Sequence, residues 1–295
     1  CTDADACRDR RPHRPSEDLA TAGMTAGGDA GRGDHREHGA IEFAAVGELA
    51  EVGVQVDPRD VTGTGHARSL GRRARRVFGM TTPLTVDVWS DVACPWCRIG
   101  RANLAHALAE FEHADDVVVT WHSFELDPTA PATSEQTVGQ MLATKYGTDE
   151  AGVAAMWDRV SELGAQAGLR FDFPNAKQGN TFDAHRLIHL AAERGLQDAV
   201  VGALFDAQHE GGASLGDHAE LARIVVAAGL QPEDVDAVLT SDAYAEQVRA
   251  DEQLAARLGI SGVPFFVIDG QYGLSGAQPT AQLVAALDQA WATGH

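Results

Sequence analysis

Two cysteines separated by two residues, Cys94 and Cys97, stand between a predicted strand and a predicted helix. Residues 84–89 alternate Leu, Val and Val with Thr, Asp and Trp, which is typical of a half-buried strand. Pro95 suits the first position of a helix, and apolar residues then recur at helical spacing as far as Phe111. A Cys-x-x-Cys motif in this setting is typical of a redox-active dithiol in an α/β fold.

The position of Cys94 at the start of a helix indicates how the two thiols divide their roles. Unpaired backbone N–H groups and the positive end of the helix dipole favour a thiolate there. We expect Cys94 to be the exposed nucleophile and Cys97 the buried thiol that resolves a mixed disulfide. Arg98 is a candidate for stabilising the thiolate. Asp91, three residues before Cys94, either repels the thiolate or carries a proton.

The same motif is also compatible with half of a zinc site or with a structural disulfide. Zinc needs two further ligands at suitable spacing, but no cysteine follows Cys97 and no histidine follows at the usual zinc-finger interval. In a cytosolic protein, so short a bridge is more often catalytic than structural. We therefore expect no metal. Cys1 and Cys7 receive no role.

The remaining pattern is a strand, a long helical block, two strands and a helix. Residues 117–124 are β-branched and aromatic, and predict the second strand. Residues 265–269 and 271–274 predict two short strands that turn at Gly270, and residues 280–291 predict an amphipathic final helix. The predicted helices of the block are residues 138–146, 150–167, 181–194, 196–210, 218–228, 232–239 and 244–258. Glycines that suit left-handed caps follow five of them: Gly147, Gly168, Gly195, Gly229 and Gly259.

Composition separates the first 79 residues from the rest. The chain of 295 residues has a formal net charge of −20, nearly all of which falls after residue 79. Residues 1–79 are rich in Gly, Arg, Asp and His and hold few core-forming side chains, so we expect a disordered tail or an over-long gene start, with the fold beginning near Met80. The acidity disfavours nucleic acid, and no apolar run approaches the roughly 20 residues needed to cross a membrane. We expect a cytoplasmic protein.

Five segments, in this order, resemble the FrnE-type branch of the DsbA family. They are SDVACPWCRIG at residues 90–100, DP-x-x-P at 127–131, NTFDAHRL at 180–187, GVPFFVI at 262–268 and LSGAQ at 274–278. The resemblance covers about residues 84–291. It implies an α/β protein with a thioredoxin fold and a large inserted all-helical domain. The thioredoxin-like domain would comprise residues 80–132 and 261–295, and the helical domain residues 133–260.

The resemblance also implies roles for residues outside the cysteine pair. Pro264 would be a cis-proline opposite the cysteines, with the backbone of Val263 available to a substrate chain. For Pro264, a proline that merely begins a strand is the plainer alternative. Trp96, between the two cysteines of the motif, places an aromatic surface between the thiols. The other implied cleft residues are Asn180, His185 and Gln278. For His185 with His189, ordinary packing is the plainer alternative to metal binding, and for Gln278 it is a turn and helix cap.

The activity that the resemblance implies is thiol–disulfide oxidoreduction. Its partners would be protein or small-molecule thiols and disulfides, with no cofactor beyond glutathione as a candidate redox partner. The related 2-hydroxychromene-2-carboxylate isomerases and kappa-class glutathione transferases have serine at the nucleophile position, where this chain has Cys94. Two alternatives stay open: a glutathione-dependent isomerase or transferase of small aromatic molecules, and a non-catalytic, chaperone-like binding module.

Overall fold

The computed structural model describes residues 82–134 and 136–294. The predicted tail, residues 1–79, and the predicted start near Met80 lie outside this part of the chain, as do Cys1 and Cys7.

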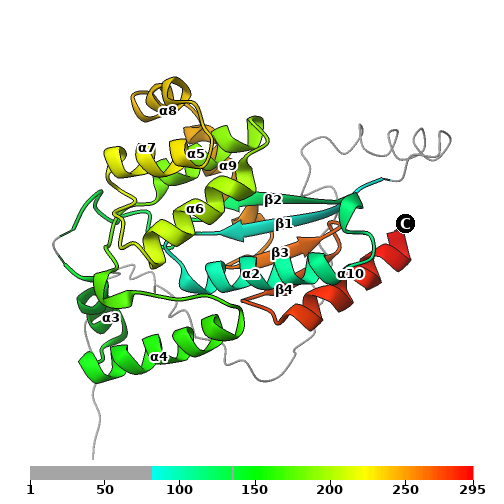
Figure 1. The fold of residues 1–295 in the computed structure, drawn as a ribbon, viewed down its shortest axis with the longest axis horizontal. Coiled ribbons are helices and arrows are strands. Elements are labelled where there is room, and N and C mark those ends of the chain that lie inside the picture. The colour runs from blue at the N-terminus through cyan, green and yellow to red at the C-terminus, as the bar shows by residue number, and fades with distance from the viewer. Residues whose placement is uncertain (1–81, 135, 295) are drawn as a thin grey trace, which may run out of the picture. The chain divides into compact units, whose positions relative to one another are not determined.

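The described residues form one mixed β-sheet from two distant parts of the chain (Figure 1). Its strands are β1 (Leu84–Ser90), β2 (Val117–Ser123), β3 (Phe265–Ile268) and β4 (Tyr272–Ser275), in the order β2-β1-β3-β4. β1 pairs in parallel with β2 and antiparallel with β3, and β3 and β4 form an antiparallel hairpin. A parallel pair needs a crossover, which α2 (Pro95–Glu110) supplies.

Most of the helices lie between β2 and β3 in the chain. They are α3 (Val138–Tyr146), α4 (Glu150–Gln166), α5 (Phe182–Glu193), α6 (Gln197–His209), α7 (His218–Ala227), α8 (Pro232–Leu239) and α9 (Ala245–Arg257). The short 3-10 helices η1 (Ala114–Asp116) and η2 (Phe173–Asn175) precede β2 and α5, and α10 (Thr280–Gly294) ends the described chain. Every predicted strand and helix is present, with ends within three residues of those expected, and all five predicted cap glycines have a positive φ.

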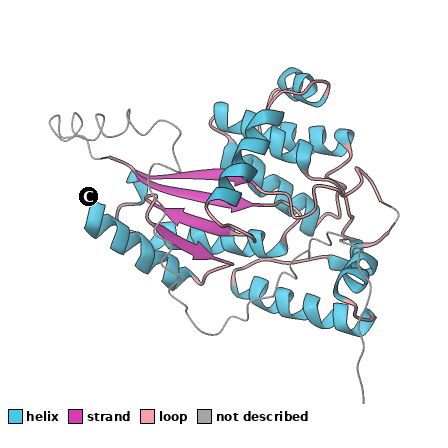
Figure 2. Ribbon diagram, turned by 180° about the vertical axis from the view of Figure 1, so that it is seen from behind, coloured by secondary structure: helices cyan, strands magenta, loops and turns pink. Residues whose placement is uncertain are grey.

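The two faces of the sheet bury different layers (Figures 1 and 2). Leu84, Val86 and Val88 of β1 join one apolar cluster with residues of α2 and α10. Trp89, which follows Val88 and points to the opposite face, instead joins Val267 of β3 in a cluster with residues at the end of α9. The strand predicted from the alternation is therefore buried on both faces. Helices α2 and α10 cover one face of the sheet, and α9 covers the other.

Candidate active site

The cysteine pair begins α2 immediately beyond the end of β1. Cys94 is the N-cap residue of α2, with φ −89° and ψ 115°, and its amide donates to the carbonyl of Asp91 at 3.0 Å. The amide of Cys97 donates to the carbonyl of Cys94 at 3.1 Å, and the two cysteines come within 3.5 Å of each other. Both are free thiols, so this is a reduced pair held close enough to form a bond after a small movement.

Cys94 is much less exposed than predicted. Cys94 is 4% exposed and Cys97 is fully buried. Cys94 is covered because the loop before β3 lies over it, where its thiol contacts the carbonyl oxygen of Val263 at 3.8 Å. The predicted order is nevertheless kept, since Cys94 is the more accessible of the two.

Burial decides the protonation of the inner thiol. Burial, and then the neighbouring Cys94, raise the pKa of Cys97 well above its usual value, against smaller opposing effects of Asp91 and Ser90. Cys97 is therefore a thiol at neutral pH. It must lose its proton before it can attack another sulfur, because the thiolate is the nucleophile.

Pro264 lies against α2, and its position depends on a glycine that the sequence reading passed over. The Val263–Pro264 peptide bond is cis, and the carbonyl of Pro264 accepts from the amide of Gly276 at 2.8 Å. Gly100 of α2 lies directly opposite. A Cβ added at Gly100 would stand 3.0 Å from Cγ of Pro264 and 3.1 Å from Cζ of Phe266. Glycine thus lets the helix approach the loop that covers Cys94.

We expect Gly100→Ala to lower the free energy of unfolding by about 1 kcal/mol in urea titrations of the reduced protein. Overpacking against Pro264 costs roughly 1–3 kcal/mol, and the better helix propensity of alanine returns up to about 1 kcal/mol. Gly262→Ala is the matched control, because a Cβ there meets nothing within 4 Å. If Gly100→Ala were as stable as the parent, Pro264 and the loop before β3 would be able to move away from the added methyl group without loss of stability.

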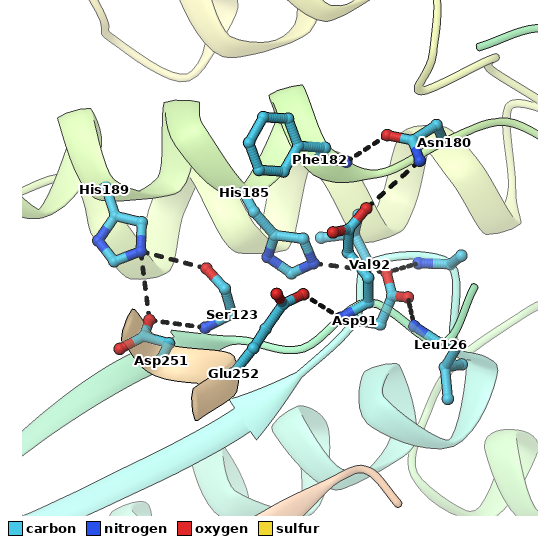
Figure 3. Close-up of polar contacts among 12 residues, drawn as sticks. Asp91, Val92, Ser123, Leu126, Asn180, Phe182, His185, His189, Asp251 and Glu252 are labelled. Atoms are coloured by element: carbon cyan, nitrogen blue, oxygen red, sulfur yellow. Dashed lines mark hydrogen bonds and ion pairs between the residues drawn. The ribbon is translucent and has the colours of Figure 1, made fainter. Parts of the chain in front are cut away.

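Asp91 is buried behind the cysteine loop and stays charged. Its Oδ1 accepts from the amide of Ala93 at 3.1 Å, and its Oδ2 from that of Leu126 at 2.8 Å. Nε2 of His185 lies 3.6 Å from Oδ1 (Figure 3). Burial alone would raise the pKa of Asp91, but His185 and the two amides outweigh it and lower the pKa. Asp91 is therefore a carboxylate held by two backbone amides, and it faces His185.

Asn180 and His185, which the resemblance placed near the cysteines, come together in a buried polar layer. Oδ1 of Asn180, two residues before α5, accepts from the amide of Phe182 at 2.9 Å (Figure 3). Its Nδ2 donates to Oε1 of Glu125 at 3.3 Å. Arg249 donates to the other oxygen of Glu125 at 2.5 Å. Burial raises the pKa of Glu125 even though Arg249 opposes it. The polar contacts of Asn180 and His185 thus go to Glu125 and Asp91 and not to the thiols.

The other predicted residues are more dispersed. Trp96, in the first turn of α2, is half-buried and packs against two separate apolar clusters. The side chain of Gln278 donates to the backbone carbonyl of Ser275 within the turn, and the backbone carbonyl of Gln278 accepts from the side chain of Asn103 on α2 at 2.9 Å.

Arg98 does not serve the thiolate as suggested. Its buried guanidinium donates to the carbonyl of Arg170 at 2.5 Å, to Asp206 at 2.9 Å and to Glu210. These partners lie on α6 and in the segment before η2, so Arg98 ties α2 to the helical block.

A second polar cluster, which the sequence reading missed, crosses the other face of the sheet. His122 of β2 lies between two carboxylates, with Nε2 3.0 Å from Asp87 and Nδ1 2.8 Å from Asp251. Asp251 also accepts from the amide of Ser123 at 2.8 Å and lies 3.2 Å from His189. Asp87, the charged residue of β1, indicated in the sequence that this face of the strand is either exposed to solvent or holds an ion pair. The partner of Asp87 could not be predicted, because it lies on another element.

Within residues 82–134 and 136–294, no group of three or more His, Cys, Asp and Glu side chains is placed to hold a metal ion. Nor does any helix of these residues have the length and apolar character needed to cross a membrane.

The sheet order β2-β1-β3-β4, with the Cys-x-x-Cys pair at the start of the crossover helix α2, defines a thioredoxin-fold protein. More particularly, the chain belongs to the DsbA-like thioredoxin domain family, which matches residues 85–288. The predicted fold, a thioredoxin fold with a helical insertion, is confirmed.

Three relatives illustrate the likeness. A probable DsbA oxidoreductase from Streptomyces coelicolor is 45% identical, covers 71% of this chain and 90% of its own, and superimposes with a TM-score of 0.68. The uncharacterized protein YwbO from Bacillus subtilis is 25% identical over 62% of this chain and 86% of its own. A 2-hydroxychromene-2-carboxylate isomerase is 13% identical, covers 71% of this chain and 97% of its own, with a TM-score of 0.54, and so shares the fold alone.

Proposed function

We propose that this protein is a thiol–disulfide oxidoreductase that acts on protein or small-molecule substrates through Cys94 and Cys97. The observation that carries the proposal is the pair itself: two free cysteines 3.5 Å apart at the N-terminus of a helix, one fully buried and the other slightly accessible. That asymmetry supports one thiol for the entry of substrate and another for its release.

The proposed chemistry is two successive thiol–disulfide exchanges. Cys94 thiolate attacks one sulfur of a substrate disulfide, forms a mixed disulfide and releases the first substrate thiolate. Cys97 thiolate then attacks the sulfur of Cys94, which breaks the mixed disulfide and releases the second thiolate. Two electrons pass from the protein dithiol to the substrate. The reverse sequence oxidises a substrate dithiol and reduces the Cys94–Cys97 disulfide.

Val263 and Pro264 are the proposed docking point for the substrate chain. The carbonyl of Val263 is already the neighbour of the Cys94 thiol, so a substrate that displaced this contact would bring its own sulfur to Cys94. Addition of an extended chain beside an exposed backbone segment is a common mode of peptide recognition.

A redox titration tests the proposal. The full chain is equilibrated in glutathione buffers of graded potential and alkylated, and the mass of the peptide that holds Cys94 and Cys97 is read. We expect a reversible two-electron transition between dithiol and disulfide. A potential above about −200 mV would assign an oxidant or isomerase, and one near about −270 mV a reductase.

Absence of any transition would refute the proposal. It would favour the glutathione-dependent isomerase or transferase, for which catalysis survives the loss of Cys97, or the binding module, which acts without either cysteine. Glutathione as the redox partner and the cytoplasm as the compartment remain predictions from the sequence.

A further inference from the structure

Cys94 is the last residue of a tight turn that follows β1. The amide of Cys94 donates to the carbonyl of Asp91 at 3.0 Å, which is the hydrogen bond that closes a four-residue β-turn. Val92 and Ala93 are the two central residues of this turn, and Val92 is 1% exposed. Because Cys94 closes the turn, the path of the turn decides where Cys94 lies relative to Cys97.

The peptide group between Val92 and Ala93, at the centre of the turn, is held at both ends. Its N–H donates to Oδ1 of Asp91 at 3.1 Å, within the turn. Its carbonyl oxygen lies 3.2 Å from Nε2 of His209, the last residue of α6. A carbonyl oxygen can only accept, so Nε2 of His209 carries a hydrogen and donates it. The second partner therefore comes from the helical block, 117 residues further along the chain.

His209 acts in this contact as a neutral donor. Burial, and then the guanidinium of Arg98, lower the pKa of His209 to about 3, against weaker opposing effects of the carbonyl contact and of Asp91. The ring of Phe171 contacts both groups, with its centre 5.1 Å from Cζ of Arg98 and 5.6 Å from the centre of the His209 ring. A neutral imidazole brings no charge to the cysteines, so what it contributes is their position.

The end of α6 that carries His209 is also fixed against α2. Arg98 of α2 forms ion pairs with Asp206 and Glu210. Positions 206, 209 and 210 are three and four residues apart, so they lie on one face of α6. This face is therefore the part of the helical block that contacts both the turn before the cysteine pair and the helix that holds it.

We propose that His209 is a positioning residue for the cysteine pair: by donating to the carbonyl of Val92, it holds the turn in the form that keeps Cys94 next to Cys97. This inference rests on the proposed function and deepens it. When the protein dithiol reduces glutathione disulfide, the Cys94–Cys97 bond forms and the glutathione S–S bond breaks. Two electrons and two protons pass to the two glutathione sulfurs. The more closely the turn holds the two cysteines beforehand, the less conformational freedom this ring closure costs.

Replacement of His209 tests the inference through the equilibrium with glutathione. His209→Phe keeps an aromatic ring but removes the donor, which leaves the buried carbonyl of Val92 without its partner. The turn then shifts until the carbonyl finds another donor, and Cys94 moves with it. We expect the equilibrium constant for disulfide formation, measured by alkylation in glutathione buffers at pH 7, to fall about threefold to tenfold. His209→Gln, whose amide N–H can donate to the same carbonyl, should stay within about twofold of the parent.

Two control variants separate positioning from stability. Leu204→Ala removes a fully buried side chain of α6 and destabilises the helical block, but it leaves the donor to Val92 in place. His218→Phe makes the same chemical change at a histidine on α7 whose side chain is 53% exposed. Both should have the equilibrium constant of the parent, and urea unfolding of each variant records its stability separately.

A measurement on the unaltered protein covers the case in which His209→Phe does not fold. In the reduced protein, the ¹⁵N signals of the His209 ring should show a neutral imidazole with its hydrogen on Nε2 between pH 5 and 8. A hydrogen on Nδ1 instead would overturn the inference.

Three results of the glutathione titration would also overturn it: an unchanged constant in His209→Phe, an equal fall in His209→Gln, or an equal fall in Leu204→Ala. Failure of the proposed function looks different, because the unaltered protein would then show no transition between dithiol and disulfide.

Discussion

Cys94→Ser is expected to abolish disulfide exchange, and Cys97→Ser to stop it halfway. A serine hydroxyl at position 94 cannot replace the thiolate that opens a disulfide, so turnover of a peptide disulfide with glutathione should fall to the uncatalysed rate. With Cys94 intact and Cys97 replaced, the first exchange still occurs but nothing within the protein releases the product. The Cys97→Ser protein should therefore accumulate a mixed disulfide on Cys94.

The trapped species makes the prediction specific. Non-reducing electrophoresis and intact mass should show one substrate chain per Cys97→Ser molecule, and none on Cys94→Ser. Cys1→Ser with Cys7→Ser is the control for general effects of thiol removal, and should retain full turnover. Unchanged turnover in both Cys94→Ser and Cys97→Ser would end the proposed function, whereas survival in Cys97→Ser alone would favour the glutathione-dependent enzyme.

The trapped complex also bears on how Val263 and Pro264 contribute. The thiol of Cys94 is turned towards the carbonyl of Val263, so a substrate sulfur must enter between them. Pro264 packs directly against Gly100, where a side chain would collide with it. A Gly100→Ala protein that folds but traps less substrate in the Cys97→Ser background would show that the loop has moved relative to Cys94.

Local signals in the sequence were sufficient for the secondary structure and for the core of the site. Helices α3 and α8 have the predicted ends, because a proline or a capping threonine starts each and the apolar period is clear between. Gly147 ends α3 in the left-handed conformation, which side chains other than glycine adopt at a cost. The Cys-x-x-Cys pair depends on one strand, one turn and one helix that are contiguous in the chain.

The remainder of the site depends on contacts that no local pattern encodes. Asp91 meets His185, and His122 meets Asp251, across more than ninety residues in each case, so their pairing follows only from the packing of α5 and α9 on the sheet. Arg98 shows the opposite failure. Its place next to Cys97 in the chain suggested a shared function, but successive helical residues point in different directions, and its guanidinium reaches α6.

His122 provides the second large effect, a loss of stability at alkaline pH. Burial alone would lower the pKa of His122, but Asp251 and Asp87, which bond its two ring nitrogens, raise it to about 9. In the unfolded chain its pKa is about 6.5. The folded state therefore binds the proton more tightly, and the stabilisation is complete below pH 6.5 and is lost as the pH rises through 9. The difference in pKa corresponds to roughly 3 kcal/mol.

Once the cysteines are removed, the other shifted groups act mainly outside this pH range, since the pKa values of Tyr146 and Tyr244 are raised from an ordinary value already near 10. The same carboxylate–histidine contacts lower the pKa of Asp251, so its contribution is lost only in acid. The raised pKa of Cys97 would also reduce stability at high pH, because the unfolded thiol ionises first. The measurement therefore uses a Cys94→Ser, Cys97→Ser background, in which urea unfolding is followed from pH 6.5 to 9.5.

In that background we expect the free energy of unfolding to fall by roughly 3 kcal/mol between pH 6.5 and 9.5. His122→Gln should already be less stable at pH 6.5, because two half-buried carboxylates lose their shared cation, and its stability should change little with pH. His106→Gln, at an exposed site on α2, should keep the full slope. An equal slope with and without His122 would mean that the imidazole between Asp87 and Asp251 is not charged in the folded protein, and that the cluster is held by neutral hydrogen bonds.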